Sequence, residues 1–476
     1  MSDTAASRRE IFFETTLAPD AAETYDLYAE LTAPEDASTL LITLHGVGFS
    51  HEYWDFPLDN EKHSFVEAAA EAGIATLNLD RLGVGRSDRP PAEELTLQAE
   101  AFVAHQLVQQ AKGEGIEGRV FDKVVIVGHS LGSGISIVEA NTYGDADGVV
   151  LTGFLHEFGP LYDDFEAALV PVSTQPDLAD LDAPEGYLAP ALGTGGTFFY
   201  EPSTNPRIAA QAEATRQTAT PAELATFAPV VADPAASSAI SAPVLSLTGA
   251  FDGLFADFGA REEAVAERAF FPGSAAHQTV VVPETGHAIQ LEERAGYATD
   301  VLLDWVARVA GGDPAAAATA VGGPDDDVVA GDDGANLVRG RAGDDLLDAG
   351  GGDDRVSGGR GDDTLVGGGG ADELRGGPGD DAFVLRPSDF ADGLQPGGRH
   401  DRIRGFEGAG DGAESGDVLR LEGFGAGAKL AFLGDLDGCP DAHLYAVRDG
   451  AGLDVATVVV TYVGDARLAV GDYAFA

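Results

Sequence analysis

The sequence predicts a two-part protein, in which an α/β domain with a mostly parallel sheet precedes an all-β domain of short repeats. Three observations support this fold class. Buried-type strands alternate with helical segments over the first part of the chain, which is typical of a parallel sheet with helices on both faces. One of these strands ends abruptly at the run Gly128-His129-Ser130-Leu131-Gly132. From Gly322 to Val384 the sequence repeats every nine residues.

The N-terminal half supplies most of the expected sheet. The first two strands read as an antiparallel pair, and the later ones are apolar runs of the kind that is buried on both faces. The expected strands are 11–16, 25–32, 38–44, 74–79, 124–127 and 148–153. The expected helices are 64–73, 91–110 and 136–140. Because parallel strands need a crossover connection, this order favours a parallel sheet.

A cap is expected to interrupt the sheet. From about 154 to 240 the alternation stops, and the aromatic content of this segment argues against a disordered insertion. The sheet resumes at 243–249 and 278–283 and closes with a helix at 295–309. The domains predicted are an α/β domain with a helical cap, a linker, a repeat domain and a β-rich flank, at 1–310, 311–321, 322–384 and 385–476.

The run from Gly128 to Gly132 fits the pattern G-x-S-x-G between a strand and a helix. In such a nucleophile elbow, a sharp turn holds the serine hydroxyl above the sheet edge at a helix N-terminus. Glycine is expected on either side because a side chain there would collide across the turn. Ser130 is therefore the predicted nucleophile, and the alternative is a glycine-rich turn in some other α/β protein.

A serine hydroxyl needs a general base, and the base needs an acid to orient it. His287 follows the last expected strand, at the sheet edge where α/β proteins place ligands. Asp252 follows the preceding strand, and the chain order Ser130, Asp252, His287 is that of a hydrolytic triad on such a sheet. Asp257 and Glu157 are alternative acids, and Asp252 could instead cap the helix that follows it.

Acyl transfer also needs N–H donors for the tetrahedral oxyanion. Leu131, directly after the nucleophile, and Val47, between two glycines in the loop after the 38–44 strand, are the expected donors. His45, His51 and His129 are expected to orient loops through hydrogen bonds rather than to act in catalysis.

The repeats follow the pattern G-G-x-G-x-D-x-U-x, in which U is apolar. Glycines turn the chain and expose carbonyl oxygens, the apolar residue fills a narrow core, and the sixth position supplies a carboxylate. Oxygen-only ligands on successive turns suit Ca²⁺. The expected ligands are Asp327, Asn336, Asp345, Asp354, Asp363, Asp372 and Asp381. Asn336 and Ala349 depart from the pattern and put the first sites in doubt, while the in-phase copies disfavour a disordered acidic linker.

Composition excludes several classes of protein. With 80 acidic and 28 basic residues the formal net charge is −52, which excludes a general nucleic-acid binder because phosphate contacts need Lys and Arg. Cys439 is the single cysteine, so no intramolecular disulfide is expected. No apolar leader follows Arg8-Arg9 and no apolar run is long enough to span a membrane, so neither a signal peptide nor a transmembrane segment is expected.

Residues from about 10 to 310 resemble the α/β-hydrolase superfamily. The His45-Gly46 loop, the run Asp80-x-x-Gly83-x-Gly85-x-Ser87, the Gly128–Gly132 elbow, Asp252 and His287 occur in the order of that family. The resemblance implies an eight-stranded, mostly parallel sheet and hydrolysis through an acyl-enzyme, without a cofactor for catalysis. A serine nucleophile points to esters, thioesters, lactones or amides, although the superfamily includes perhydrolases and members without catalysis.

The repeats resemble the RTX calcium-binding β-roll. The segment from Asp401 to the C-terminus resembles the flank and the uncleaved type I secretion region that follow RTX repeats in secreted proteases and lipases. This resemblance implies a secreted, extracellular protein that crosses the envelope unfolded through a type I secretion apparatus, with no N-terminal signal. Calcium outside the cell would then fold the roll.

Taken together, these features predict a secreted serine hydrolase, esterase-like or lipase-like, with a small-molecule ester as substrate and calcium as a structural ion. The aromatic side chains of the cap either line a pocket for an apolar acyl or aryl group or form the core of the cap itself. The alternatives are an extracellular calcium-binding matrix or adhesion protein with an inactive hydrolase domain, or a peptidase, lactonase or perhydrolase.

Overall fold

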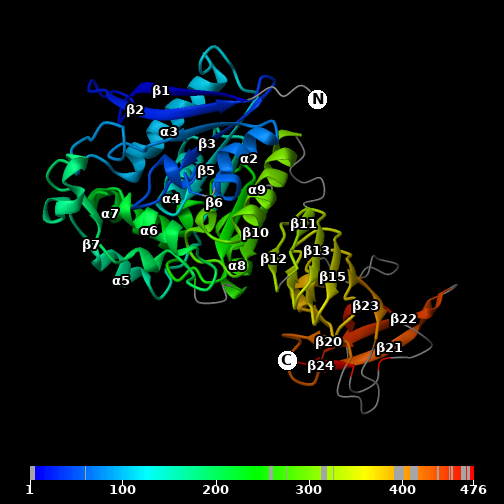
Figure 1. Cartoon of the computed structure of the whole chain (residues 1–476). Helices are drawn as coiled ribbons and strands as arrows, with labels where there is room; N and C mark the ends of the chain where they lie inside the picture. Colours follow the sequence, from blue (N-terminus) through cyan, green and yellow to red (C-terminus); the bar gives the residue numbers. More distant parts are fainter. Residues whose placement is uncertain are drawn as a thin grey trace. The chain divides into compact units, whose positions relative to one another are not determined.

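The structure is a computed structural model that describes residues 6–58, 60–256, 261–274, 276–311, 319–324, 326–390, 401–407, 416–436, 439–449, 451, 454–462, 468 and 472–475. The chain forms two compact units (Figure 1). The first comprises Met1–Ala275 and Val281–Asp313, and the second comprises Ala276–Val280 and Pro314–Ala476.

Eight strands follow one another in the order β1-β2-β4-β3-β5-β6-β9-β10, and all of them except β10 lie wholly within the first unit. β1 pairs with β2, and β2 with β4, in antiparallel fashion. The pairs β3–β4, β3–β5, β5–β6 and β6–β9 are parallel. The large, mostly parallel sheet predicted from the sequence is thus confirmed. The bounds are β1 Ser7–Thr15, β2 Tyr25–Ala33, β3 Thr39–Leu44, β4 Ala75–Leu79, β5 Lys123–His129, β6 Gly148–Thr152, β9 Val244–Gly249 and β10 His277–Val282.

Helices cover the sheet, and β3 and β6 are accordingly buried at every position. The helices pack in two groups, α3 with α4 and α2 with α9. Trp305 of α9 lies so close to β6 that a side chain at Gly148 would overlap its ring. The bounds are α1 Asn60–His63, α2 Phe65–Glu71, α3 Leu97–Lys112, α4 Leu131–Thr142, α8 Arg261–Ala266 and α9 Ala295–Ala310.

Two helices begin at places other than those predicted. α3 begins at Leu97 rather than near residue 91, because Thr96 caps it by accepting a hydrogen bond from the Ala99 N–H. α4 begins at Leu131, directly after the elbow, rather than at Ser136. The glycine- and serine-rich start of α4 reads as a loop in sequence, but Ser136 Oγ donates to the Gly132 carbonyl and Gly134 packs against the ring of Phe227.

The segment between β6 and β9 forms the cap, and it is less helical than expected. Besides α5, α6 and α7 it contains short 3₁₀ turns and the antiparallel strand pair β7–β8. Strong N-capping defines α7, where the Thr220 side chain and Glu223 form a reciprocal capping box. The bounds are α5 Tyr162–Ala167, β7 Leu169–Pro171, β8 Leu188–Pro190, α6 Pro206–Ala214 and α7 Pro221–Ala232.

The repeats of the second unit fold into two parallel sheets. Successive repeats alternate between the sheets, so strands in one sheet are related by eighteen residues, as in Leu347 beside Leu365 and Val338 beside Val356. One set of strands runs in the order β12-β14-β16-β18-β20-β24 and the other in the order β11-β13-β15-β17-β19-β23-β22-β21. The bounds are β11 Thr319–Val321, β12 Val328–Ala330, β13 Leu337–Ala342, β14 Leu346–Asp348, β15 Arg355–Arg360, β16 Thr364–Val366, β17 Glu373–Arg375, β18 Ala382–Leu385, β19 Asp401–Phe406, β20 Val418–Leu421, β21 Lys429–Leu436, β22 Cys439–Arg448, β23 Asp454–Tyr462 and β24 Tyr473–Phe475.

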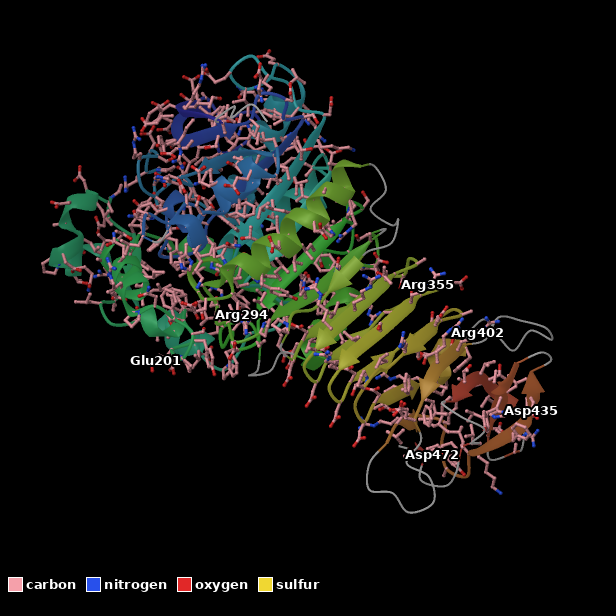
Figure 2. The ribbon with its side chains drawn as sticks, turned by 45° about the vertical axis from the view of Figure 1, so that its right-hand side comes forward. Glu201, Arg294, Arg355, Arg402, Asp435 and Asp472 are labelled. Atoms are coloured by element: carbon pink, nitrogen blue, oxygen red, sulfur yellow. The ribbon has the colours of Figure 1, made fainter. Side chains whose placement is uncertain are left out.

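A narrow apolar core lies between the two sheets of the second unit. The eighth position of each repeat points inward and is almost fully buried, as the pattern predicts, whereas neighbours such as Arg355 and Arg402 project outward (Figure 2). The buried residues are Val329, Val338, Leu347, Val356, Leu365, Leu374 and Phe383. Among the described residues, no helix has the length and apolar character needed to cross a membrane.

Candidate active site and calcium-binding repeats

Ser130 stands on a strained turn between β5 and α4. Its backbone has φ 54° and ψ −116°, a conformation that residues with a side chain rarely adopt. A Cβ added at Gly128 would lie 2.4 Å from the Gly132 carbonyl oxygen, and one added at Gly132 would lie 2.3 Å from that of Leu44. Only glycine fits at either place, so the turn has the geometry expected of a nucleophile elbow.

His287 and Asp252 meet at the same edge of the sheet. The loops after β10 and β9 carry them, and His287 Nδ1 lies 3.0 and 3.1 Å from the two carboxylate oxygens of Asp252. Both side chains are buried, and the carboxylate partner places the imidazole proton on Nδ1, which leaves Nε2 as an acceptor. Within the described residues Nε2 has no hydrogen-bond partner. Asp252 also accepts from the Leu254 N–H at 3.0 Å, so it orients the histidine and caps its own turn.

The elbow and the His287 loop approach each other at the end of β6. The Ser130 N–H donates to the Thr152 carbonyl at 2.8 Å. A Cβ added at Gly153 would lie 2.7 Å from the His129 ring and 3.0 Å from the His287 carbonyl oxygen. The rings of His129 and His287 are 4.7 Å apart. The three residues of the predicted triad therefore come from loops that meet at the carboxyl edge of the sheet.

The loop after β3, which carries the oxyanion candidate Val47, lies against the elbow. A Cβ added at Gly46 would lie 2.9 Å from Ser130 Cβ. His45 holds this loop, since its Nδ1 donates to the Gly46 carbonyl at 2.9 Å and its Nε2 accepts from the Arg81 N–H at 3.2 Å. Burial and the Arg81 charge lower the pKa of His45 to about 3, so the imidazole is neutral, as this pattern requires.

The other expected donor, Leu131, is the first residue of α4. His51 and His129 have the orienting contacts predicted for them: His51 Nδ1 lies 2.7 Å from Asp80 Oδ1, and His129 Nδ1 lies 3.2 Å from Thr152 Oγ1. Tyr53 stacks on His129, with ring centroids 4.2 Å apart. These contacts fix the loops on both sides of Ser130.

Of the two alternative acids, the structure describes Glu157. Glu157 is exposed, whereas Asp252 is buried beside His287, and Asp257 lies outside the described residues. A further buried pair, missed by the sequence analysis, lies nearby: His156 Nδ1 is 2.8 Å from Glu267 Oε1. His156 and Glu267, which lies between α8 and β10, are far apart in sequence. No sequence motif predicts that they pair.

Glu292 is a buried residue that the sequence analysis also missed. Its carboxylate accepts from the Gly286 N–H at 2.9 Å, next to His287, and from the Tyr200 N–H at 3.2 Å and the Ser203 hydroxyl at 2.8 Å in the cap. Burial raises its pKa to about 7. In sequence it belongs to the charged run Glu292-Glu293-Arg294, which reads as an exposed turn. In the fold it joins the histidine loop to the cap.

The described aromatic side chains of the cap lie in two different places. Phe198 of the cap stacks near His287, with ring centroids 5.8 Å apart, and it also contacts Phe49 at 5.2 Å. Phe255 flanks His287 at 5.5 Å. Tyr187, in contrast, is fully buried in a separate cap core with Val172 and its neighbours. The surroundings of the histidine are therefore apolar and aromatic.

The sixth-position carboxylates of the repeats form ladders along the roll. In each pair, the Oδ1 atom of the later carboxylate accepts a hydrogen bond from the backbone N–H of the residue eighteen positions earlier. Asp363 Oδ1 accepts from the Asp345 N–H at 2.9 Å, and Asp381 Oδ1 accepts from the Asp363 N–H at 3.0 Å. Within the described residues, the second oxygen is buried without a hydrogen-bond partner in Asp345, Asp354, Asp363, Asp372 and Asp381. The chain thus satisfies one oxygen of each carboxylate and leaves the other free for a cation.

The glycines at the start of the repeats leave room for these oxygens. A Cβ added at Gly376 would lie 1.9 Å from Asp381 Oδ2. Burial raises the pKa of Asp345 and of Asp354 to about 8, and neighbouring carboxylates add to the effect. Buried oxygens, exposed carbonyls and crowded negative charge are the donor set that suits Ca²⁺, which would supply the missing positive charge. The residues present therefore fit a structural calcium ion.

The ladders contain one amide in place of a carboxylate and extend beyond the repeats. Asn336 Nδ2 donates to Asp332 Oδ1 at 3.0 Å, while its Oδ1 is buried without a hydrogen-bond partner among the described residues, like the second oxygens of the aspartates. Beyond the repeats, Asp401 and Asp417 continue the two ladders by accepting the N–H groups of Asp372 and Asp381, at 3.2 and 3.1 Å. The fragments Asp401-x-Ile and Asp417-x-Leu have the D-x-U spacing of the repeats, which was the signal available in the sequence.

Comparison with known families agrees with both units. The model of the alpha/beta hydrolase family matches residues 41–301, and the RTX calcium-binding nonapeptide repeat matches residues 321–356 and 348–383. Because the first match spans more than half of the 476 residues, the chain belongs to the α/β hydrolase family. It also carries RTX repeats, which are calcium-binding repeats.

Individual relatives are distant. A proline iminopeptidase of Thermoplasma volcanium is 29% identical over 131 residues, which make up 27% of this chain and 39% of that relative. Among solved structures, a thermophilic esterase from Thermogutta terrifontis has 20% identity and a TM-score of 0.45, over 63% of this chain and 99% of its own. An esterase from Exiguobacterium antarcticum has 18% identity and a TM-score of 0.42, over 62% and 98%. Identities at this level say nothing about the substrate.

Proposed function

We propose that the chain is a secreted serine hydrolase that cleaves carboxylic esters with an apolar acyl or aryl group. The observation that carries the proposal is the buried contact between His287 Nδ1 and Asp252, which leaves Nε2 of the histidine open beside the elbow of Ser130. A base held in one tautomer next to a strained serine is the arrangement that serine hydrolysis requires.

Each residue then has a defined role. His287 Nε2 removes the Ser130 hydroxyl proton as Oγ attacks the ester carbonyl, while the N–H groups of Val47 and Leu131 stabilise the oxyanion. The imidazolium, stabilised by Asp252, returns the proton to the departing alcohol. Water repeats these steps on the acyl-enzyme and releases the carboxylic acid. Phe198 and Phe255, which flank the histidine, favour an apolar acyl or aryl group.

Secretion is part of the same proposal and is supported by the repeats. RTX repeats are typical of type I secretion, and carboxylate ladders that need an external cation suit a unit that folds only outside the cell. The roll would then serve export and folding, with no part in the chemistry.

The test is hydrolysis of p-nitrophenyl esters of increasing acyl length by the full-length protein in calcium. Ser130→Ala should lower kcat by about four to six orders of magnitude. Ser136→Ala, on the same helix, is the matched control and should retain activity, since its hydroxyl bonds only to the Gly132 carbonyl. A fluorophosphonate should label the wild type and the control but not the Ser130 variant.

Three other results would redirect the proposal. If the wild type is labelled but cleaves a proline p-nitroanilide instead of the esters, the site is a peptidase, as the name of the Thermoplasma relative indicates for that protein. Labelling together with turnover of lactones or peracids would indicate those chemistries. Neither labelling nor turnover would favour the calcium-binding matrix or adhesion protein with an inactive hydrolase domain.

A further inference from the structure

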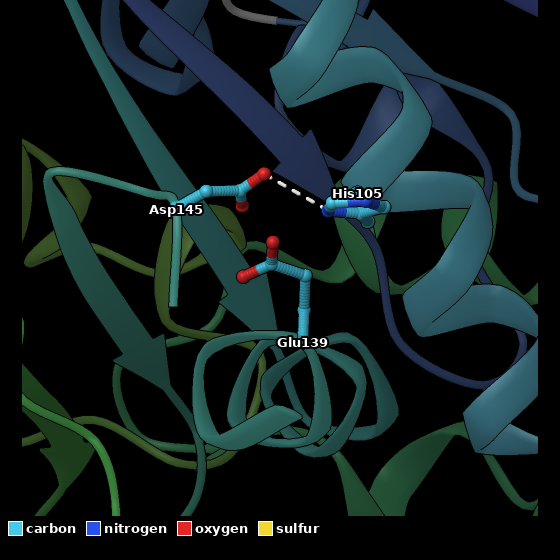
Figure 3. A group of neighbouring side chains, drawn as sticks. All are labelled: His105, Glu139 and Asp145. Carbon is cyan, nitrogen blue, oxygen red and sulfur yellow. Dashed lines mark ion pairs between the residues drawn. The ribbon is translucent and has the colours of Figure 1, made fainter. Parts of the chain in front are cut away.

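A second cluster of ionisable side chains lies away from the candidate active site, at the opposite end of α4. His105 comes from α3, Glu139 from the last turn of α4, and Asp145 from the connection between α4 and β6 (Figure 3). Their candidate ligand atoms all lie within 4.8 Å of one another. Glu139 follows Ser130 by nine residues on the helix, so at about 1.5 Å per residue the two sites are about 13 Å apart.

Glu139 is the least satisfied member of this cluster. Its side chain is fully buried, and within the described part of the chain neither carboxylate oxygen has a hydrogen-bond partner. Figure 3 shows this carboxylate pointing between His105 and Asp145. Burying a carboxylate without a donor is costly, so the arrangement calls for a positive group or a proton in the space between the three side chains.

The two neighbours border that space and approach each other as an ion pair (Figure 3). His105 Nδ1 lies 2.9 Å from Asp145 Oδ2, but this contact lacks the geometry of a hydrogen bond. Tyr143 stacks on the imidazole at 4.1 Å between ring centroids and fixes its orientation. Asp145 Oδ2 accepts from the Gln109 amide, while Oδ1 has no partner among the described residues. One nitrogen of His105 and carboxylate oxygens of Glu139 and Asp145 therefore surround the same small space.

The positive charge that acts on Glu139 is bonded to other groups. Lys112 lowers the pKa of Glu139 through its charge, but its amine bonds to the Asp145 carbonyl and pairs with Asp147 at 2.6 Å rather than with Glu139. The last turn of α4 has no basic residue, so the negative end of the helix dipole is also uncompensated there. His105 and Asp145 are each about one-fifth exposed, at 22% and 18%, which gives an ion a route from solvent.

We propose that His105, Glu139 and Asp145 bind a divalent transition-metal ion, for which Zn²⁺ is the best match. One imidazole nitrogen and two carboxylate oxygens are ligands that Zn²⁺ takes in tetrahedral sites, with water in the remaining position. Ca²⁺, by contrast, takes oxygen ligands, so this site differs in chemistry from the RTX repeats. The ion would tie α3, the C-terminal end of α4 and the following turn together, and it would stabilise the first unit without contacting the substrate.

A shared proton is the competing explanation. Burial and the adjacent Asp145 raise the pKa of Glu139 to about 9, so a protonated Glu139 could donate to Asp145 in the absence of any metal. The two explanations predict different responses to added Zn²⁺, which makes them separable by experiment.

The test is calorimetric titration of the full-length, metal-stripped protein with Zn²⁺ in excess Ca²⁺, which keeps the RTX repeats saturated. The wild type should bind one equivalent, and His105→Ala and Glu139→Gln should weaken that binding at least tenfold. His443→Ala is the matched control, because it removes another histidine–carboxylate contact, 2.7 Å from Asp435, in the second unit. Zn²⁺ should raise the melting temperature of the wild type and the control only.

A second measurement on the wild type guards against a variant that fails to fold. X-ray absorption at the zinc edge should show one nitrogen-type imidazole neighbour among oxygen neighbours. Equal binding by all variants, or absorption showing oxygen neighbours alone, would overturn the proposal in favour of adventitious binding to the acidic surface. Absence of wild-type binding, with Glu139→Gln as stable as the wild type, would overturn it in favour of the shared proton.

Discussion

The two units treat buried charge in opposite ways. In the first unit, buried ionisable groups mostly find partners in the chain: Arg81 pairs with Glu100 and Glu223 at 2.5 and 2.6 Å, and His287 with Asp252 at 3.0 Å. In the second unit, each carboxylate in a row of buried Asp side chains accepts a hydrogen bond through one oxygen. The other oxygen has no hydrogen-bond partner among the described residues. The buried charges of the first unit are therefore mostly neutralised by other groups of the chain, whereas those of the second unit need a cation from the solvent.

The cores differ in the same sense. The first unit fully buries large aromatic side chains such as Trp54 and Tyr28. The core between the two sheets of the roll consists mostly of aliphatic residues. Apolar burial in so thin a core offsets little of the entropy of ordering a glycine-rich chain. Cation binding is therefore expected to decide whether the second unit folds.

The largest expected effect is that of calcium removal, which should separate the two units. With EGTA, amides of β14 and β16 should lose their protection from hydrogen exchange completely, while amides of β5 remain protected. Site-resolved exchange by mass spectrometry on the full-length protein measures both at once. Restoring calcium, but not magnesium, should return the protection. Loss of protection in β5 as well would contradict the claim that only the second unit needs calcium to fold.

A matched pair of core truncations tests where each unit obtains its stability. Leu365→Ala and Leu41→Ala each remove a fully buried leucine, at about 2–5 kcal/mol. The first should raise the calcium concentration needed to fold the roll and leave the melting of the first unit unchanged. The second should lower the melting temperature of the first unit equally at low and high calcium. Calorimetric scans across a calcium series distinguish these outcomes, and a shared response would contradict the independence of the units.

Glu292 is a buried carboxylate of the first unit without a basic partner in the contacts given above. The stability that it contributes is therefore expected to depend on pH. Because burial raises its pKa from 4.5 to about 7, ionisation is less favourable in the folded state than in the unfolded chain. Its contribution to stability is complete below pH 4.5 and is lost as the pH rises toward 7, by up to about 3 kcal/mol. Glu292→Gln cannot titrate, so the stability of the wild type relative to this variant should fall over that range.

Urea denaturation of both proteins between pH 4.5 and 7.5 measures this difference, and all other titrating groups cancel. Glu293→Gln, at the neighbouring exposed position, is the control and should show no such trend. A constant difference between wild type and Glu292→Gln would mean that the carboxylate is fully stabilised by its three donors.

The smallest expected effect concerns the ladder position that follows the repeats. Asp401→Asn keeps the oxygen that accepts the Asp372 N–H and removes only the negative charge. It should raise the midpoint of calcium-induced folding by a few-fold, with little effect at saturating calcium. Circular dichroism across a calcium titration measures this, with exposed Asp36→Asn as the control. An unchanged midpoint would show that the ladder ends with the repeats.

Local sequence patterns predict much of this fold. The features that they did not predict depend on residues from other elements of the fold. Gly128, Ser130 and Gly132 are recognisable because the turn tolerates few residues, and the repeats because each position has one task. Glu292 and the pair of His156 with Glu267 were missed because their partners are distant in sequence. The start of α4 was misplaced because its serines and glycines, loop formers by propensity, are held by bonds and packing from other elements.

The eighteen-residue period of the roll constrains how such a chain can change in length. Removing a single nonapeptide would transfer every later strand to the opposite sheet, so that β19 and the antiparallel strands after it would meet the wrong neighbours. Removing or duplicating two nonapeptides together keeps each strand beside an equivalent one. Tandem duplication and deletion in the gene should therefore be tolerated in even steps, and the parity of the copy number should be inherited even where the number itself drifts.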